Sequence, residues 1–456
     1  MKTLTFIAAF ALALARTASA QTADQYNQLK QQIDGLQKQV EGLKASGTQI
    51  MSREPKKEKL EWGGFGEMAY QNIGARQENG SASPYHDIAN LTRISIDGIY
   101  HFNDQVRAKF EVEVLNAGVN SMTTNSLSKN ISVDIEQAFV DDKLSEAAGL
   151  RAGLVIVPMG LTNDHHRPDD YDGVFRPSTE IYLIPSTWRE LGAGLFGTFG
   201  PEKMVSYRSY VVSGFNPVAG STSTTYTPNI INQVTGFTGS QAIKGGRSLG
   251  TIGLAKDGAW VTRVDVSPVK GSFVGASYYV GQAGQGQVSS EIPIEIWEAH
   301  AHGEYRNARL QALFVQGNIG NAGQLDAIIK NNSSVTAKDY VGGRFWGGYV
   351  SLDYNVMPLI KPEGLKGLEH LGPYFRFERY STAAHLPAGY AGNGANDRTE
   401  WTVGLSARPI KNVLLKAEYQ WLNNSAHQVG APALVENGQL PLTGVHEFNL
   451  GLAYTF

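Results

Sequence analysis

Apolar and polar residues alternate with a period of two from Glu61 to the last residue of the chain. Residues 104–116 show the pattern clearly. Their apolar set is Val106, Ala108, Phe110, Val112 and Val114, and their charged set is Arg107, Lys109, Glu111 and Glu113. Side chains point alternately to the two faces of a β-strand, so the pattern predicts strands with one apolar and one charged face.

Stretches of this kind number sixteen. They begin near residues 61, 89, 104, 131, 148, 191, 204, 258, 272, 293, 308, 341, 371, 397, 412 and 445. Short and long connections alternate between them, as is typical of bacterial outer-membrane barrels with an even strand number. We therefore predict an all-β fold, a 16-stranded antiparallel transmembrane β-barrel over residues 61–456. Eighteen strands are the alternative if Ser248 to Leu254 forms a strand.

The last stretch carries a regular apolar face made of Phe448, Leu450, Leu452, Tyr454 and Phe456. In a closed barrel the last strand pairs with the first, so we expect this strand to pair with the one near Trp62. An aromatic-rich final strand ending in phenylalanine is what outer-membrane assembly machinery recognises. That machinery is therefore an expected partner, together with outer-membrane lipid.

Residues 1–20 have the features of a secretory signal peptide. Lys2 precedes an apolar segment, and Ala18-Ser19-Ala20 is an A-x-A cleavage site. Removal of Lys2 and Arg16 changes the formal charge from −3 to −5. An exported barrel predicts a location in the outer membrane of a Gram-negative cell.

Residues 21–51 follow a different period. Apolar residues recur at alternating steps of three and four, at Tyr26, Leu29, Ile33, Leu36, Val40 and Leu43. This spacing predicts a periplasmic coiled-coil helix of three heptads, joined to the barrel by a linker at residues 52–60. Leucine at every d position with Ile or Val at a favours a two-stranded coil. The alternative is a helix that packs on its own barrel or plugs it.

The composition narrows the chemistry further. The chain has no cysteine, which excludes disulfides and thiolate metal sites. Its 51 glycines and 20 tyrosines suit tight turns and interfacial aromatic girdles.

Sixteen strands enclose an aqueous channel rather than a packed core. By alternation, the basic residues that we expect to line this pore are Arg93, Arg107, Lys109, Arg263, Arg376 and Lys416. Acidic residues share the same faces, among them Glu111, Glu113, Asp134, Glu136 and Glu298. Rings of Arg and Lys select anions, but a sequence does not reveal which of these charges cluster in space.

The third long connection, residues 158–190, contains four prolines in a length that usually marks a functional loop. Folded into the lumen, it would narrow the pore. Its candidate solute contacts are His165, His166, Arg167, Arg176 and Arg189. Arg176 and Arg189 are the first choices for an anionic solute, because a guanidinium matches phosphate and carboxylate geometry. The alternative is that these arginines pair with nearby carboxylates and hold the loop to the wall.

Two motifs for other chemistry are weak. His300 and His302 share a strand face, but no third ligand at a convincing spacing accompanies them. Residues 246–250 match G-x-S-x-G around Ser248, without the strand and helix that a nucleophile elbow needs. We expect no metal, no cofactor and no catalytic residue.

Several segments resemble the phosphate-selective porin O and P family. They are the heptad-bearing N-terminus, residues 153–161, Arg176-Pro177, residues 184–192, residues 415–419 and residues 448–456. The resemblance implies a homotrimer of sixteen-stranded barrels, each with its own pore for passive diffusion of anions. The basic ladder of phosphate-specific members does not match this sequence position by position.

The expected function is therefore an outer-membrane porin for small hydrophilic solutes, with anions such as phosphate preferred and loop 158–190 as the constriction. One alternative is a porin for carboxylates or sugars without phosphate preference. Others are a barrel lipase or protease and a soluble adhesin or binding protein.

Overall fold

The structure is a computed structural model that describes residues 30, 31, 34, 35, 38, 59–76, 87–115, 132–219, 234–250, 254–332, 338–360, 367–425 and 445–456. The chain divides into two units, Met1–Glu58 and Lys59–Phe456. The described residues of the first unit are helical. The predicted signal peptide and the predicted seam, Tyr26, Leu29, Ile33, Leu36, Val40 and Leu43, lie outside the described residues.

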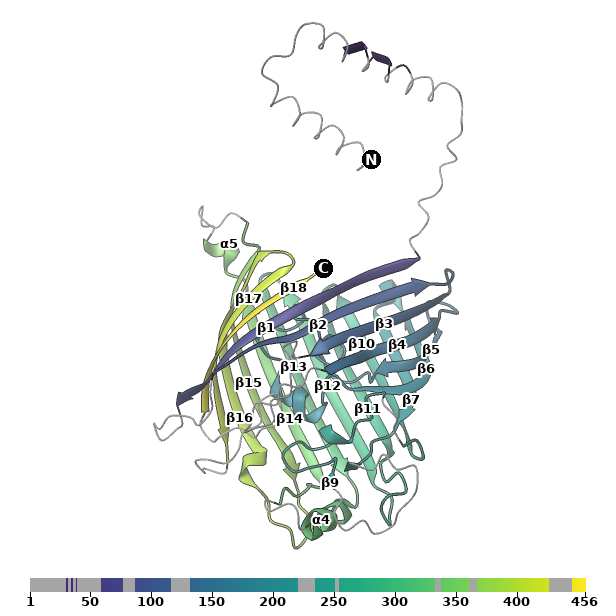
Figure 1. Cartoon of the computed structure of the whole chain (residues 1–456), viewed down its shortest axis with the longest axis vertical. Helices are drawn as coiled ribbons and strands as arrows, with labels where there is room; N and C mark the ends of the chain where they lie inside the picture. The colour runs from purple at the N-terminus through teal and green to yellow at the C-terminus, as the bar shows by residue number, and fades with distance from the viewer. Residues whose placement is uncertain are drawn as a thin grey trace. The chain divides into compact units, whose positions relative to one another are not determined.

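In the described part of the second unit, sixteen strands form a closed antiparallel barrel (Figure 1). These strands are β1 (Leu60–Arg76), β2 (Ile88–His101), β3 (Val106–Leu115), β4 (Ser132–Asp142), β5 (Gly149–Ile156), β6 (Arg189–Phe199), β7 (Val205–Ser213), β10 (Gly258–Val269), β11 (Ser272–Gln282), β12 (Pro293–Tyr305), β13 (Ala308–Ile319), β14 (Arg344–Tyr354), β15 (His370–Ala384), β16 (Asp397–Ile410), β17 (Val413–Asn424) and β18 (Val445–Thr455). They follow chain order around the wall, and β1 pairs with both β2 and β18.

The predicted strand number and the predicted closing pair are both confirmed. At the seam, Met68 lies opposite Leu452 and Tyr70 lies opposite Leu450. Gly66 leaves room for the Tyr454 ring there, since a Cβ on Gly66 would lie 2.5 Å from it. The eighteen-strand alternative is not supported, because the sixteen described strands already close the barrel, Leu249 and Gly250 lie in a turn, and β10 begins only at Gly258.

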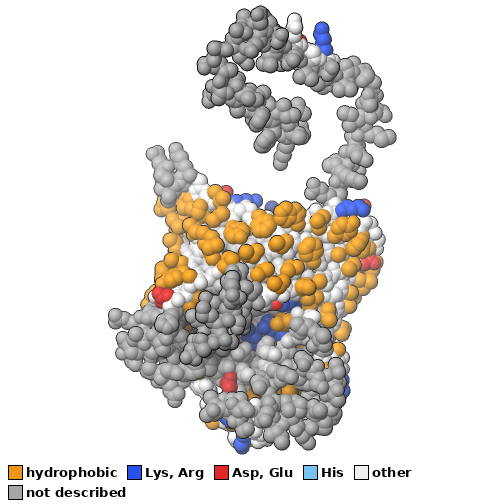
Figure 2. Space-filling model, viewed as in Figure 1, with side chains coloured by type: hydrophobic (Ala, Val, Ile, Leu, Met, Phe, Trp, Pro, Cys, Tyr) orange, Lys and Arg blue, Asp and Glu red, His pale blue; other side chains and the backbone are white. Residues whose placement is uncertain are grey.

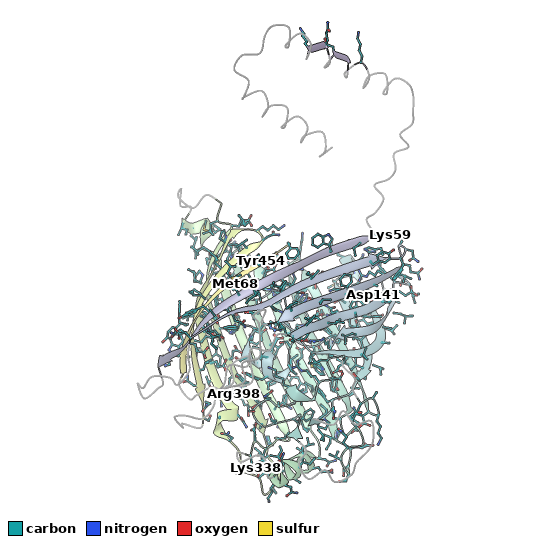
Figure 3. All side chains as sticks on the ribbon, viewed as in Figure 1. Lys59, Met68, Asp141, Lys338, Arg398 and Tyr454 are labelled. Carbon is teal, nitrogen blue, oxygen red and sulfur yellow. The ribbon has the colours of Figure 1, made fainter. Side chains whose placement is uncertain are left out.

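The connections divide the barrel into a short-turn end and a long-loop end. Figure 3 labels Lys59 at the short-turn end and Lys338 among the long loops. The alternation of lengths has one exception, because residues 355–369 at the short-turn end include the helical turn α5 (Met357–Ile360). The long-loop end carries α4 (Ala322–Asn331) and the small sheet of β8 (Val218–Ala219) and β9 (Val234–Thr235).

The outer face of the barrel is apolar. Its exposed side chains include Trp62, Val211, Trp297, Trp401 and Leu450. Figure 2 shows hydrophobic side chains spread over the wall in a broad belt. Soluble monomers rarely expose apolar surface on this scale, whereas a membrane barrel turns such a belt to lipid.

The helices in the described residues are short. None of these helices has the length and hydropathy needed to cross a bilayer.

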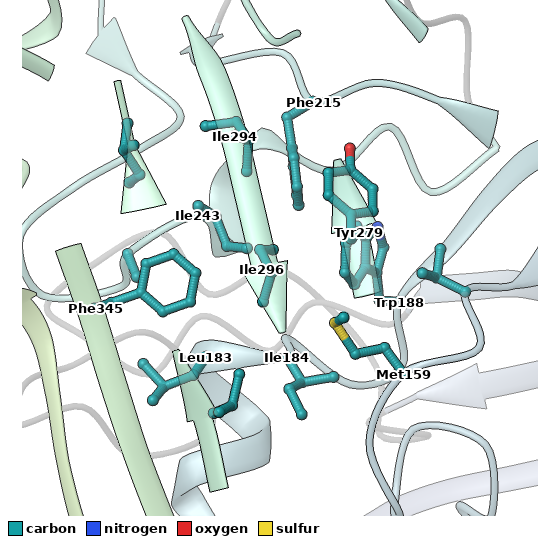
Figure 4. Packing of buried hydrophobic residues seen from close by; sticks show 14 of the residues in the cluster. Met159, Leu183, Ile184, Trp188, Phe215, Ile243, Tyr279, Ile294, Ile296 and Phe345 are labelled. Carbon is teal, nitrogen blue, oxygen red and sulfur yellow. The ribbon is translucent and has the colours of Figure 1, made fainter. Parts of the chain in front are cut away.

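The lumen holds a hydrophobic cluster toward β10–β15. Met159, Leu183, Ile184 and Trp188 from the connection between β5 and β6 pack there against wall residues such as Ile294 and Ile296 (Figure 4). The Trp188 ring stacks on Phe215, with 4.8 Å between ring centroids. Part of the inward face is therefore apolar, in contrast to the polar lining that alternation alone predicts.

Candidate functional site

The connection between β5 and β6, residues 157–188, is the third loop, and it folds into the lumen. Its helix α3 (Ser178–Leu183) packs on β14 and β15 and is buried apart from Ser178. Arg189 and Glu190, which the sequence prediction assigned to this loop, are the first two residues of β6.

Wall carboxylates bind the backbone of the third loop. Glu378 accepts hydrogen bonds from the N–H groups of Ser178 (3.2 Å) and Thr179 (2.8 Å) at the start of α3. Glu418 accepts one from the Val174 N–H at 2.8 Å. These acceptors satisfy backbone donors that would otherwise be buried without partners.

Wall cations bind the loop's carbonyl groups in the same way. Lys416 Nζ donates to the carbonyls of Pro168 (2.5 Å), Tyr171 (2.8 Å) and Gly173 (2.9 Å). Arg93 donates to the His166 carbonyl at 2.6 Å and also pairs with Glu67 and Glu113. Much of the charge on the inward faces therefore positions the loop.

His166 is a further anchor of the third loop. Its Nε2 lies 3.0 Å from Glu111 Oε1 on β3, and both side chains are buried. Burial by itself lowers the pKa of His166, but the hydrogen bond to Glu111 and its charge outweigh burial and raise the pKa overall. Of the other predicted contacts, His165 lies beside Asp164, and Arg167 lies half-exposed near Phe65 and Asp97.

An open cavity of about 240 Å³ remains in the lumen, between the third loop and the wall formed by β17, β18 and β1–β4. Its lining includes six basic residues, Arg93, Arg176, Arg189, Lys244, Arg247 and Lys416, and four acidic ones, Glu67, Glu113, Asp134 and Glu136. The lining thus has a formal surplus of two positive charges. The acidic residues all come from strands, whereas three of the six basic residues come from the connections between strands.

Arg189 lies at the centre of the acidic part of this cavity. Its Nη1 donates to Glu136 Oε1 at 2.7 Å, and its Nη2 lies 3.3 Å from Asp134 Oδ2. Asp134 and Glu136 are two residues apart on β4, so they share its inward face. One guanidinium therefore pairs with two carboxylates. Both alternatives predicted for Arg189 from the sequence, contact with a solute and pairing with nearby carboxylates, are compatible with this position.

Sequence reasoning missed Lys244 and Arg247, which lie in the long connection between β7 and β10. Arg247 donates to the carbonyls of Lys244, Pro185 and Thr187. Burial, followed by the neighbouring charge of Arg189, lowers the pKa of Arg247 to about 10. No periodic signal marks loop residues of this kind, so only the path of the loop brings them to the cavity.

Four predicted pore-lining residues do not line the cavity. Arg263 is buried between Asp265 and the third loop at Gly160, and Arg376 pairs with Glu378 at 2.8 Å and donates to the Phe175 carbonyl. Arg107 pairs with Asp141 at 2.9 Å. Lys109 is half-buried on β3.

The two weak motifs have ordinary environments. His300 lies between Asp265 (2.7 Å) and Glu298 (2.8 Å), and the described residues contain no group of three or more His, Asp or Glu that could hold a metal. Ser248 donates its hydroxyl to Glu190 and follows the short helix η2 (Lys244–Gly246). This local structure is not the strand–turn–helix of a nucleophile elbow.

Comparison with known proteins places the fold. No protein-family model matches the chain. A protein of Aquifex aeolicus (strain VF5) described as uncharacterized is 25% identical over 361 residues, which cover 78% of this chain and 74% of that protein.

Among solved structures, the chain is similar to OmpF of Salmonella typhi in complex with daunomycin. The TM-score is 0.51 at 13% identity, over 87% of this chain and 97% of that one. The fold is that of a porin. An anion-selective porin from Comamonas acidovorans is also similar, with a TM-score of 0.50 at 12% identity, over 87% of this chain and 99% of that one. At such identities the likeness concerns the porin fold alone.

Proposed function

We propose that this porin barrel lies in the outer membrane and lets small hydrophilic solutes diffuse passively, with a preference for anions. The observation that carries the preference is the cavity lining, in which six basic residues face four acidic ones. Unbalanced positive charge raises the local concentration of anions in a narrow aqueous path.

The outer-membrane location rests on the apolar belt and on the closed barrel, in which each of the sixteen described wall strands is paired on both sides. The periplasmic helix at residues 21–51, the homotrimer and recognition of the strand ending at Phe456 by assembly machinery remain parts of this proposal. Their basis is the sequence pattern and the family resemblance described above.

Phosphate is one of the anions proposed to pass. Arg176 and Arg189 line the cavity and offer guanidinium groups for a tetrahedral oxyanion. The same guanidinium groups also match the geometry of carboxylates, so a pore without phosphate preference is the competing version of the same function.

Purified protein in planar lipid bilayers tests the proposal. We expect discrete conductance steps, and with chloride on one side and phosphate on the other we expect a zero-current potential that shows both anions crossing. Absence of channels would contradict the porin function. With potassium as the cation at different concentrations on the two sides, a zero-current potential equal to the potassium equilibrium potential would contradict the anion preference.

A further inference from the structure

The cavity beside β4 contains a buried hydrogen-bond acceptor and a buried hydrogen-bond donor that have no partner among the described residues. We propose that this cavity is a binding site for small ampholytes, solutes that carry both a carboxylate and an ammonium group, with acidic amino acids preferred. The inference rests on the proposed porin function and names the solute class for its pore.

The acidic side of the site is Glu136 with Asp134. The Glu136 side chain is 1% exposed, and its Oε2 has no hydrogen-bond partner among the described residues. Asp134 beside it is 29% exposed in its side chain and shares Arg189 with Glu136. Burying an acceptor without a partner is costly, so this position favours a solute that donates hydrogen bonds. An ammonium group supplies three hydrogen-bond donors. Its positive charge also balances the second carboxylate of the pair, since Arg189 balances only one.

The basic side of the site is Arg189 with Arg247. The Nε atom of the buried Arg189 also has no hydrogen-bond partner among the described residues. Arg247 forms hydrogen bonds to backbone carbonyls and no ion pair in the described part of the chain. A solute carboxylate accepts well from guanidinium groups, because charge-assisted hydrogen bonds are stronger than neutral ones.

The opposite signs lie within one small cavity, which excludes simpler solutes as the best fit. A plain anion satisfies the guanidinium groups but leaves Glu136 Oε2 without a donor. A plain cation donates to Glu136 Oε2 but leaves the guanidinium groups without an acceptor. The surplus positive charge of the lining also repels it. An acidic amino acid supplies one ammonium and two carboxylates, which matches both the acidic pair and the basic surplus.

Glutamate and glutarate form a matched pair of probes, because glutarate is the same chain without the ammonium group. In planar bilayers, each is added to a fixed potassium chloride solution, and interruptions of the chloride current are recorded. We expect glutamate to interrupt the current at several-fold lower concentration than glutarate, although glutarate has the greater net negative charge.

The variant Glu136→Gln should abolish the advantage of glutamate and leave block by glutarate unchanged or stronger. Glu304→Gln, at an exposed carboxylate near the end of β12, is the matched control and should behave like the wild type. Asp134→Asn provides a second variant if Glu136→Gln fails to fold, and should weaken the glutamate advantage.

Equal or stronger block by glutarate in the wild type would overturn the ampholyte site while leaving an anion-preferring porin intact. A glutamate advantage that persists in Glu136→Gln and Asp134→Asn would overturn the assignment of the acidic pair. Absence of channels in the wild type would instead contradict the proposed porin function.

Discussion

At the scale of single residues, charge on an inward face has two distinct uses in this barrel. Arg263 with Asp265 and Arg376 with Glu378 are pairs two positions apart on one strand, and both arginines hold the third loop. Other basic residues line the cavity and contribute to its charge, among them Arg176, Arg189 and Arg247. In these two cases an arginine with a carboxylate two positions away on the same strand forms a structural ion pair.

Arg247→Gln should reduce the anion preference of the pore. At about 15 Å and an effective dielectric constant of about 20, one unit charge contributes on the order of 1 kcal/mol, which is a several-fold change in local anion concentration. The measurement is the chloride-to-potassium permeability ratio from zero-current potentials.

Arg306→Gln, in the exposed turn between β12 and β13, is the matched control for Arg247→Gln and should leave that ratio unchanged. An equal ratio in both variants would mean that Arg247 acts only as an anchor for Pro185 and Thr187.

The His166–Glu111 contact predicts a pH-dependent stability. Since the pKa of folded His166 is raised above its unfolded value, its contribution is complete below about pH 6.5 and is lost as the pH rises through the folded pKa. The difference in thermal unfolding midpoint between wild type and His166→Asn should therefore shrink between neutral and alkaline pH. If the difference in unfolding midpoint stays constant over that pH range, the charge of the imidazolium does not contribute to stability.

At the scale of elements, the third loop is held in the lumen by two kinds of contact. Polar contacts satisfy its backbone along β12, β15 and β17, and apolar packing of Trp188 on Phe215 and Tyr279 fixes its C-terminal end. Such packing predicts a constriction of fixed shape rather than a loose flap.

Trp188→Ala should loosen this constriction. Removing a buried aromatic side chain typically costs about 3–5 kcal/mol, and here the loss falls on the docking of the loop. We expect larger single-channel conductance with more open-channel noise. Trp297→Ala, on the outer face, removes the same side chain away from the loop and should leave conductance and noise as they are.

Strand positions were predictable because period-two alternation is a local property of the sequence. Predicted and observed strand starts differ by at most three residues, the largest gap being at Arg344. The cavity was not predictable to the same degree. Lys244 and Arg247 reach it from a connection of 44 residues, 214–257. The path of this connection depends on non-local packing of its own Phe215 and Phe237 in the luminal hydrophobic cluster.

At the scale of the whole molecule, closure of the barrel rests on the pairing of β1 with β18. The absence of cysteine makes this seam easy to test. Met68→Cys with Leu452→Cys joins two directly opposed positions and should form a disulfide that keeps the heated protein compact in gel electrophoresis.

Met68→Cys with Leu450→Cys is the register control for this seam. Leu450 lies opposite Tyr70, so the two sulfur atoms are displaced along the strands and should cross-link poorly. Equal cross-linking of both pairs would contradict the register.

The charge balance of the whole lumen gives the most direct test of the central claim, that this barrel is an anion-preferring pore. The measurement is the zero-current potential of the purified wild-type protein in a planar bilayer between concentrated and dilute potassium chloride. Chloride that crosses faster than potassium makes the dilute side negative, which is the predicted result. A positive dilute side, produced by faster potassium, would contradict the claim.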